Sequence, residues 1–355
     1  MSPSAVLLAA DNFTPPSRTP WGGRRLLQGL KKALPLAPEK ALYPVVGESW
    51  ELSVEPDFPS VCDDGTPLAQ RLREDPVGWL GREARRDPPG TALLVKLLDA
   101  DDELSVQIHP DDHFPGLKPG ECGKPESWYV VSAEPGAGLY LGLAEGVTRD
   151  TLEPALRRGD DLSQLLGWTP VEPGDFLLIE AGTVHAIGRG LTLVEPQKVL
   201  PGLRGITYRY WDWNRRYDPA GRLDPGGSPR ALHVTEALAV TRWDAPRGER
   251  FLAGARVRAG SPSLEGPARL EALCGERAAL RSEHLQVARL HGTGALEAPP
   301  WGALVALTVL DGAVTVRQAQ GALVVPRGRT AALPAALGGY AFELVGAHAV
   351  LSAVY

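Results

Sequence analysis

Short runs of alternating or continuous apolar residues, separated by glycine and proline, dominate this chain. Side chains on a strand point alternately to opposite faces, so the alternation of Trp50, Leu52 and Val54 predicts a strand. Longer apolar runs bounded by turn residues also predict strands. They lie at residues 91–100, 104–110, 127–143 (two strands about a Pro-Gly turn) and 173–187 (two strands about the turn at 181–183).

Two segments of the first part of the chain have helical patterns. Residues 66–87 predict one or two short helices interrupted at Pro76, because proline cannot continue a helix. Residues 148–167 predict two short helices, and Asp150 is expected to cap the first of them. These helices would interrupt a chain that is otherwise rich in strands and turns.

The last third of the chain begins with a predicted helix and continues in short strands. Ser228 followed by Pro229 resembles an N-cap and a first helical residue, which would start a helix through 231–240. Residues 305–328 alternate like a hairpin with its turn at Asp311-Gly312. This rhythm repeats that of the first β region without its candidate ligands, so we predict a second β domain.

Composition agrees with this pattern and narrows the classes of function. A chain of 355 residues is long enough for two domains, and 40 glycines and 33 prolines favour a turn-rich β fold. The net charge of -6 argues against a general nucleic-acid partner. No apolar run is long enough to predict a membrane span, and the first residues lack the basic region of a signal peptide. The three cysteines show no CxxC spacing, which predicts free thiols in a reducing cytoplasm.

Four potential metal ligands lie on the predicted strands or directly beside them. Gln107 and His109 alternate along one strand and therefore face the same side. Glu126 opens the next β-rich run, and His185 lies just past a tight turn. One amide oxygen, two imidazoles and one carboxylate meet only if these strands line a barrel. Such nitrogen and oxygen donors suit Zn²⁺ and leave room for substrate or water.

Cationic and hydroxyl side chains near these ligands are candidates for binding an anionic group. Lys96 lies inside an apolar strand, where lysine is unusual, and Ser105 and Lys124 are close to the ligands in the pattern. Arginine can bind phosphate with two parallel hydrogen bonds, so Arg209 and Arg215 are further candidates.

At this point the motifs resemble those of the type I mannose-6-phosphate isomerases, in particular the short bacterial form. The resemblance extends from about residue 20 to residue 240. The matching segments, in order, are PWGGRRL, GESWELS, LLVKLLDADDELSVQIHPDD, GKPESWYVV, PGDFLLIEAGTVHAIGRG and ITYRYWDWNR.

The resemblance implies a mostly β protein with two cupin-like domains, each a β-barrel or sandwich, and a few short helices. Residues 1–240 would form the metal-binding cupin domain with an N-terminal segment and helical insertions. Residues 241–355 would form a degenerate cupin-like domain without metal. The family interconverts mannose 6-phosphate and fructose 6-phosphate with Zn²⁺, so one zinc ion per chain is expected, with other divalent metals as alternatives. Its metal ligands would be Gln107, His109, Glu126 and His185, and its catalytic arginine would be Arg209.

One segment departs from the family pattern. After the last histidine strand the chain reads VEPQKVLPGLRGITYR, which is longer than usual and contains Pro196 and Pro201. The extra loop, residues 196–206, also carries Arg204, which competes with Arg209 for the role of the catalytic arginine.

The predicted reaction is an aldose–ketose isomerisation through a cis-enediol. A base removes the C2 proton and the proton returns at C1, while the metal holds or polarises the C1 and C2 oxygens and Arg209 stabilises the developing oxyanion. The sequence does not identify the base. Glu195, Lys124 and a metal-bound water all remain candidates, and Lys96, Ser105 and Arg215 are expected to bind substrate.

Two other functions remain open at this stage. A non-catalytic cupin that binds a metal and a phosphosugar would act as a sensor or regulator. A metal-dependent oxygenase fits less well, because such enzymes usually hold iron with more histidines or a facial triad of histidines and a carboxylate. In each case we expect a small-molecule ligand, no nucleic-acid or membrane partner, and a monomer or small homo-oligomer.

Overall fold

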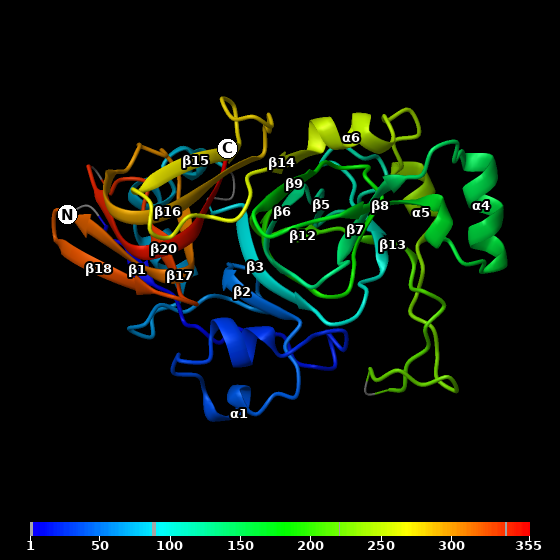
Figure 1. Ribbon diagram of the computed structural model, residues 1–355, viewed down its shortest axis with the longest axis horizontal. Helices are drawn as coiled ribbons and strands as arrows, with labels where there is room; N and C mark the ends of the chain where they lie inside the picture. The colour runs from blue at the N-terminus through cyan, green and yellow to red at the C-terminus, as the bar shows by residue number, and fades with distance from the viewer. Residues whose placement is uncertain (1–2, 87–89, 220, 338) are drawn as a thin grey trace.

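The computed structural model describes residues 3–86, 90–219, 221–337 and 339–355, and most of its regular structure is β-strand. Figure 1 shows two groups of strands side by side, with the later strands on the left and the strands of the first β region on the right. This arrangement confirms the prediction of a mostly β fold with short helices. Within the described ranges, no helix is both long and apolar enough to cross a membrane.

Two sheets of the first β region pack against each other. Their apolar side chains share one core, in which Val130, Leu139 and Ile187 are buried. The larger sheet has the order β14-β9-β6-β11-β3-β2 and consists of β2 (Glu48–Leu52), β3 (Leu93–Ala100), β6 (Glu126–Ala133), β9 (Asp175–Ile179), β11 (Leu191–Lys198) and β14 (Arg256–Arg258). The smaller sheet has the order β13-β4-β10-β7-β8 and consists of β4 (Val106–Ile108), β7 (Gly138–Leu143), β8 (Leu166–Pro170), β10 (His185–Ile187) and β13 (Tyr208–Trp211).

A third sheet collects the strands of the last third of the chain. Its order is β1-β19-β17-β20-β16-β15, with β18 paired to β17. Its members are β1 (Val6–Leu7), β15 (Arg269–Cys274), β16 (Leu285–Glu297), β17 (Val305–Gln318), β18 (Gly321–Pro326), β19 (Thr330–Leu333) and β20 (Ala341–Val354). Strand β1, from the N-terminus, belongs to this sheet, whereas β14, from beyond residue 240, pairs with β9 of the larger sheet. Strands therefore pair across residue 240 in both directions, and the two-domain division stays a prediction.

The predicted hairpin turn at Asp311-Gly312 is wrong. Strand β17 runs through these residues, and its register against β20 shifts there, between Val309 and Ala313. Gly312 has a φ of 64°, and a Cβ at this position would lie 2.2 Å from the Gly346 carbonyl oxygen. The glycine therefore permits a bulge and a close approach to β20 rather than a turn. The chain turns instead between β17 and β18.

The helices follow the predicted positions with shifts at their ends. The break at Pro76 is confirmed, and the predicted end at Asp87 lies outside the described residues. The segment 148–167 forms one helix and a single 3₁₀ turn before β8 begins. The helices are α1 (Pro38–Ala41), α2 (Leu68–Glu74), α3 (Pro76–Leu80), α4 (Arg149–Arg158), α5 (Val234–Val240) and α6 (Gly248–Ala255), with 3₁₀ turns at Arg82–Arg85 and Ser163–Leu165.

Two predicted helix caps are wrong. Thr148, not Asp150, is the N-cap of α4. Helix α5 starts at Val234 rather than beside Ser228, because Ser228 pairs through its backbone with Tyr217 at 2.9 Å in both directions. A residue whose backbone is held by these two hydrogen bonds is not free to begin a helix.

A buried ion pair connects the N-terminal segment with β2 and the third sheet. The Nζ of Lys31 lies 2.6 Å from Glu51 Oε1, and neither side chain is exposed by more than 2%. Lys31 also donates to the Ala10 carbonyl at 2.8 Å. The other oxygen of Glu51 accepts a hydrogen bond from Thr330 of β19 at 2.8 Å. One carboxylate thus holds three parts of the chain together.

Removing one partner of this pair would leave a buried charge uncompensated. We expect Lys31→Met to lower the free energy of unfolding by ~3–5 kcal/mol, measured by denaturant unfolding. The double variant Lys31→Met/Glu51→Gln should lose clearly less than the sum of the two single losses, because the two residues interact. Additive losses would contradict the pairing.

Candidate metal centre and its cavity

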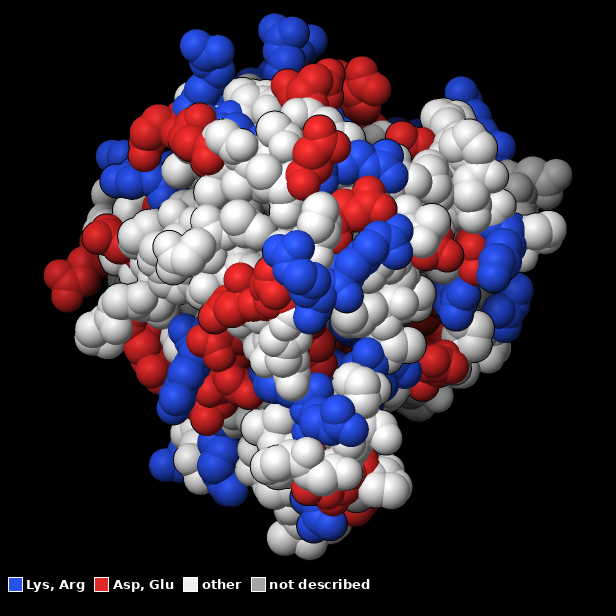
Figure 2. Space-filling model, turned by 90° about the vertical axis from the view of Figure 1, so that its right-hand side faces the viewer, with Lys and Arg blue, Asp and Glu red and all other residues white. Residues whose placement is uncertain are grey.

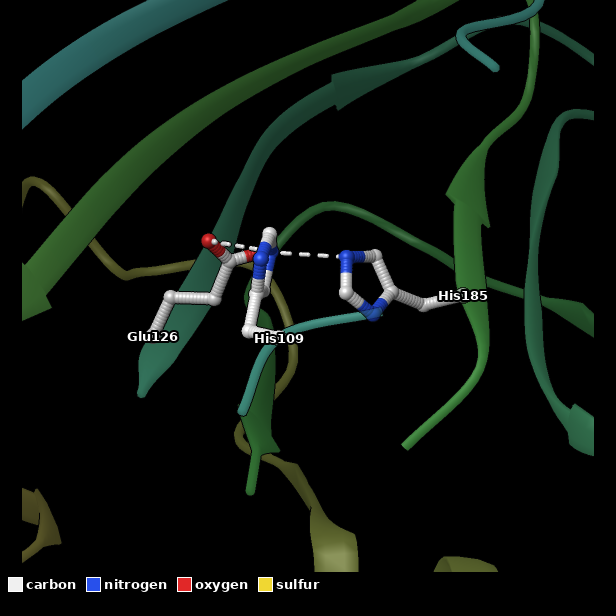
Figure 3. Close-up of side chains that lie close together, drawn as sticks. All are labelled: His109, Glu126 and His185. Atoms are coloured by element: carbon white, nitrogen blue, oxygen red, sulfur yellow. Dashed lines mark ion pairs between the residues drawn. The ribbon is translucent and has the colours of Figure 1, made fainter. Parts of the chain in front are cut away.

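Strands from the two facing sheets bring three potential ligands together. His109 directly follows β4, His185 opens β10, and Glu126 opens β6 in the opposite sheet. Figure 3 shows their side chains converging on one point. The Nε2 atoms of His109 and His185 lie 3.3 Å and 3.4 Å from the two carboxylate oxygens of Glu126, and the three potential ligand atoms lie within 4.8 Å of one another. The convergence expected of strands that line a barrel is present.

Both imidazole rings are oriented by backbone carbonyls. The Nδ1 of His109 lies 3.0 Å from the Ile206 carbonyl oxygen, and the Nδ1 of His185 lies 2.8 Å from that of Thr183. Because a carbonyl only accepts, each Nδ1 carries the hydrogen and each Nε2 presents a lone pair. Both Nε2 atoms are buried and lack a hydrogen-bond partner in the described part of the chain.

Electrostatics keep both histidines neutral. Burial, followed by the charge of Lys124, lowers the pKa of His109 to about 3. Burial also lowers the pKa of His185. Two neutral rings with inward lone pairs are what a divalent cation requires of histidine.

Glu126 is the anionic member of the group and is 2% exposed. Burial acts against its ionisation, but the charge of Lys124 outweighs burial and holds the pKa of Glu126 well below its usual range. The Nζ of Lys124 lies 3.1 Å from Glu126 Oε2, which also accepts a hydrogen bond from Gln197 Nε2 at 2.8 Å. The carboxylate is therefore charged and held in place.

The donor set fits a divalent metal ion. Two unpartnered imidazole nitrogens and one carboxylate match the composition of a zinc site that retains an open position. Gln107, the predicted fourth ligand, faces His185 in the register between β4 and β10. Its amide nitrogen donates to Ser105 Oγ at 3.1 Å, which leaves the amide oxygen for a metal. Its role as a ligand stays a prediction.

A cavity leads away from this group. Its inner part, about 50 Å³, is lined by Glu126, His185 and Glu195. Its outer part, about 400 Å³, is lined by arginines and acidic residues. The two parts share six lining residues, namely Glu48, Lys96, Leu104, Ser105, Gln107 and Lys124. We call them the inner and the outer cavity.

Lys96 and Glu195 face each other across neighbouring strands in the inner cavity. The Nζ of Lys96 lies 3.6 Å from Glu195 Oε2 and 3.7 Å from Glu48 Oε1. Burial acts to lower the pKa of Lys96, but these two carboxylates raise it. For Glu195, burial and the charge of Glu126 outweigh the pull of Lys96 and raise the pKa to about 7. Its Oε1 accepts a hydrogen bond from Trp128 Nε1 at 3.1 Å.

Arg209 reaches the cavity, whereas Arg215 does not. Arg209 lies on β13 opposite Gln107, and its Nε donates to Ser105 Oγ at 3.1 Å. Arg215 instead donates to Asp102 at 2.8 Å and Asp212 at 2.7 Å, and it lines a separate pocket. Two carboxylates hold Arg215 away from the place that the sequence predicted for it.

Arg204, the competing arginine of the extra loop, is at the edge of the outer cavity. The loop forms the short strand β12 (Arg204–Gly205), which pairs with β5 (Glu121–Cys122). The side chain of Arg204 is 74% exposed and pairs with Glu121 at 2.8 Å. It is therefore already matched by a carboxylate.

Sequence reasoning missed three residues of the site. Gln197 alternates with Glu195 on β11, so strand periodicity would have placed it beside a known candidate. Glu48 opens β2, on which no candidate had been named. Arg230 also lines the outer cavity. It lies in an irregular segment, where no periodic signal points to a site.

Comparisons with known proteins show which sequences and folds the chain is similar to. No protein-family model matches the chain. The chain is 34% identical to the mannose-6-phosphate isomerase of Streptococcus mutans over 224 residues, which are 62% of this chain and 63% of that protein. It is 37% identical to a mannose-6-phosphate isomerase of Bacillus subtilis over 201 residues, which are 55% and 58% of the two chains. The matches thus span about three fifths of the relatives' own length.

Solved structures extend the likeness to nearly the whole chain. The crystal structure of the mannose 6-phosphate isomerase from Bacillus subtilis has a TM-score of 0.74 at 22% identity and covers 99% of both chains. The enzyme from Salmonella typhimurium, solved with fructose 6-phosphate and zinc, has a TM-score of 0.66 at 15% identity and covers 99% of this chain. The chain therefore shares the fold of phosphomannose isomerases and is similar in sequence to mannose-6-phosphate isomerases, as its motifs predicted.

Proposed function

We propose that this protein is a metal-dependent aldose–ketose isomerase that interconverts mannose 6-phosphate and fructose 6-phosphate. The observation that carries the proposal is the buried group His109, Glu126 and His185, whose unpartnered Nε2 atoms face a carboxylate beside a cavity rich in charged groups. The sequence similarity to mannose-6-phosphate isomerases supports the choice of substrate.

The proposed cofactor is one zinc ion per chain, held by these three residues and Gln107. The structure from Salmonella typhimurium, solved with zinc, supports zinc as the ion. When bound, the metal would supply a positive charge that polarises the oxygens on C1 and C2 of the sugar.

Glu195 is the favoured general base. A base that moves a proton between C2 and C1 works best when its pKa lies near the operating pH, and the pKa of Glu195 is raised to about 7. The alternative, Lys124, is paired with Glu126 at 3.1 Å. Its ammonium group is therefore better placed to donate a hydrogen bond to a sugar oxygen than to accept a proton.

Three residues are proposed to hold the sugar during this transfer. Among the described residues, Arg209 is the one cavity arginine with no carboxylate partner, so its charge is free to stabilise the oxyanion that grows as the enediol forms. Ser105 accepts hydrogen bonds from Arg209 and Gln107, which leaves its hydroxyl hydrogen to donate. Lys96 lies beside the proposed base and is placed to bind a sugar hydroxyl.

The setting of the reaction is also a proposal. We infer a cytoplasmic enzyme, because Cys62, Cys122 and Cys274 are buried free thiols. The partner is a small sugar phosphate.

A coupled assay of fructose 6-phosphate formation tests the function. Thermal stabilisation by the sugar phosphate without turnover would favour the alternative of a non-catalytic sensor.

Loss of either histidine should remove the metal. We expect His109→Ala and His185→Ala each to lose most bound zinc and nearly all isomerase activity, because each change removes a ligand. Elemental analysis of the purified variants gives the metal content. Full zinc occupancy in either variant would show that the ligand assignment is wrong.

The enzyme should require the phosphate group of its substrate. We expect free mannose to be a very poor substrate, since the cations that line the outer cavity would have no anion to bind. Steady-state kinetics with mannose and with mannose 6-phosphate provide the comparison. Comparable kcat/KM values for the two sugars would refute this expectation.

Arg209 should affect the chemical step more than binding. We expect Arg209→Ala to lower kcat by on the order of 10²-fold, with intact zinc content and a smaller change in KM. Arg204→Ala is the control, because Arg204 is exposed and already paired with Glu121. A larger loss of kcat for Arg204→Ala would assign the catalytic role to the extra loop, and a pure KM effect at Arg209 would make it a phosphate ligand.

A further inference from the structure

Positive charge in the cavity is matched by carboxylates almost everywhere. Lys124 pairs with Glu126, and Arg18 pairs with Asp57 at 3.3 Å. Arg204 pairs with Glu121. Lys96 has two acidic partners, Glu48 and Glu195. The same local pairing is visible on the face shown in Figure 2, where acidic and basic side chains lie next to one another. A cation without its own carboxylate therefore stands out.

Arg209 and Arg230 form such an unbalanced pair in the outer cavity. Arg230 donates two hydrogen bonds of 2.6 Å to Asp212, but Asp212 also accepts one of 2.7 Å from Arg215. Arg209 has no acidic partner among the described residues and donates to the carbonyl of Ala231, the residue after Arg230, at 3.0 Å. Asp212 is thus shared, and Arg215 is also paired with Asp102. Three arginines therefore meet two carboxylates, and the cluster retains one excess positive charge.

The two guanidinium groups are close enough to affect each other. Burial, followed by the charge of Arg230, lowers the pKa of Arg209. Both groups also keep a nitrogen without a partner: the Nη1 of Arg230 and the Nη2 of Arg209 make no hydrogen bond to any described residue. Two adjacent cations with free N–H donors are the arrangement that binds a phosphate group.

Arg230 is held in a fixed orientation. Its Nη2 donates to the Tyr217 hydroxyl at 3.2 Å, and its guanidinium lies 4.9 Å from the centre of the Tyr217 ring. Together with the two bonds to Asp212, these contacts fix the plane of the group before a ligand arrives. Such preorganisation reduces the entropy lost on binding.

The remainder of the outer cavity is less suited to an anion. Glu55 and Asp57 line it as well, and burial together with the charge of Asp57 raises the pKa of Glu55. Arg18, beside them, is already paired with Asp57. Like charges would repel a phosphate there, so the side of the cavity with Arg209 and Arg230 is favoured.

We propose that Arg230 is a specificity-determining residue that binds the substrate phosphate in the outer cavity. This inference rests on the proposed function. The C1 and C2 end of the sugar would lie in the inner cavity beside Glu126 and His185, and the phosphate on C6 would extend outward. Both arginines line the outer part alone, but Arg209 contacts Ser105, which lines both parts, and Arg230 makes no such contact among the described residues. Arg230 thus acts on the phosphate rather than on the reacting carbons.

Arg230→Met tests this assignment. We expect KM for mannose 6-phosphate to rise by about tenfold to a hundredfold, the cost of losing a charge-assisted contact, with less than about a threefold change in kcat and unchanged zinc content. Inhibition by inorganic phosphate should weaken by a similar factor. Arg230→Lys keeps the charge but loses the planar fork, and its KM should lie between those of the wild type and Arg230→Met.

Arg204→Met is the matched control, because it removes the same charge from the edge of the same cavity. Its KM should change by less than about threefold, since Glu121 already neutralises Arg204. An unchanged KM in Arg230→Met, or an equal rise in both variants, would overturn the proposal. If Arg230→Met fails to fold, Arg230→Lys decides the question.

Binding of inorganic phosphate separates this proposal from the proposed isomerase activity. The wild type should be stabilised against heat by millimolar phosphate, and Arg230→Met should lose most of that stabilisation while Arg204→Met retains it. A wild type without turnover but with this pattern would overturn the isomerase function and keep the anion site. Isomerase turnover in the wild type, together with phosphate stabilisation and KM that do not change in Arg230→Met, would overturn the anion site and keep the isomerase function.

Discussion

A carboxylate that is taken out of water must be compensated, and Glu126 sets this requirement at the centre of the protein. The ammonium group of Lys124 and the amide of Gln197 compensate one of its oxygens, and the two neutral histidines of the opposite sheet face the carboxylate with their Nε2 lone pairs. No strand alone provides these partners, because β4, β6, β10 and β11 each contribute or lead into one of them. The two sheets must therefore close around Glu126, and this closure creates the candidate metal site.

The same need for compensation divides the cavity into two chemically different parts. In the inner part Lys96 and Lys124 are both paired with carboxylates of the protein, so their positive charges are largely neutralised before a ligand binds. In the outer part Asp212 is shared by Arg215 and Arg230, and Arg209 lacks an acidic partner among the described residues. Local charge balance therefore supports the proposal that proton transfer takes place in the inner part and anion binding in the outer part.

Strand periodicity predicted which candidate ligands lie together, because a side chain on a strand needs only the correct face to reach a site. It placed Gln107 and His109 together and would also have found Gln197. It failed where partners far apart in sequence decide the outcome. Arg215 looked like a phosphate ligand until Asp102 and Asp212 were seen to hold it, and Ser228 looked like a helix cap until its pairing with Tyr217 was known. The residues between β13 and α5 are irregular, so only the fold reveals Arg230 in the cavity.

The third sheet supports the cavity through the other face of the same strands. Glu126 and Trp128 face the site on β6, and the next side chain, Tyr129, points to the opposite side and shares a hydrogen bond of 2.8 Å with His348 of β20. On β2, Trp50 lines the cavity while its neighbour Glu51 bonds to Thr330 of β19. Because side chains alternate along a strand, Trp128 and Trp50 face the cavity while their neighbours Tyr129 and Glu51 bond to the third sheet. The third sheet, whose described residues form no candidate metal site of their own, can therefore fix the geometry of the cavity, because it binds the opposite faces of two strands that line it, β2 and β6.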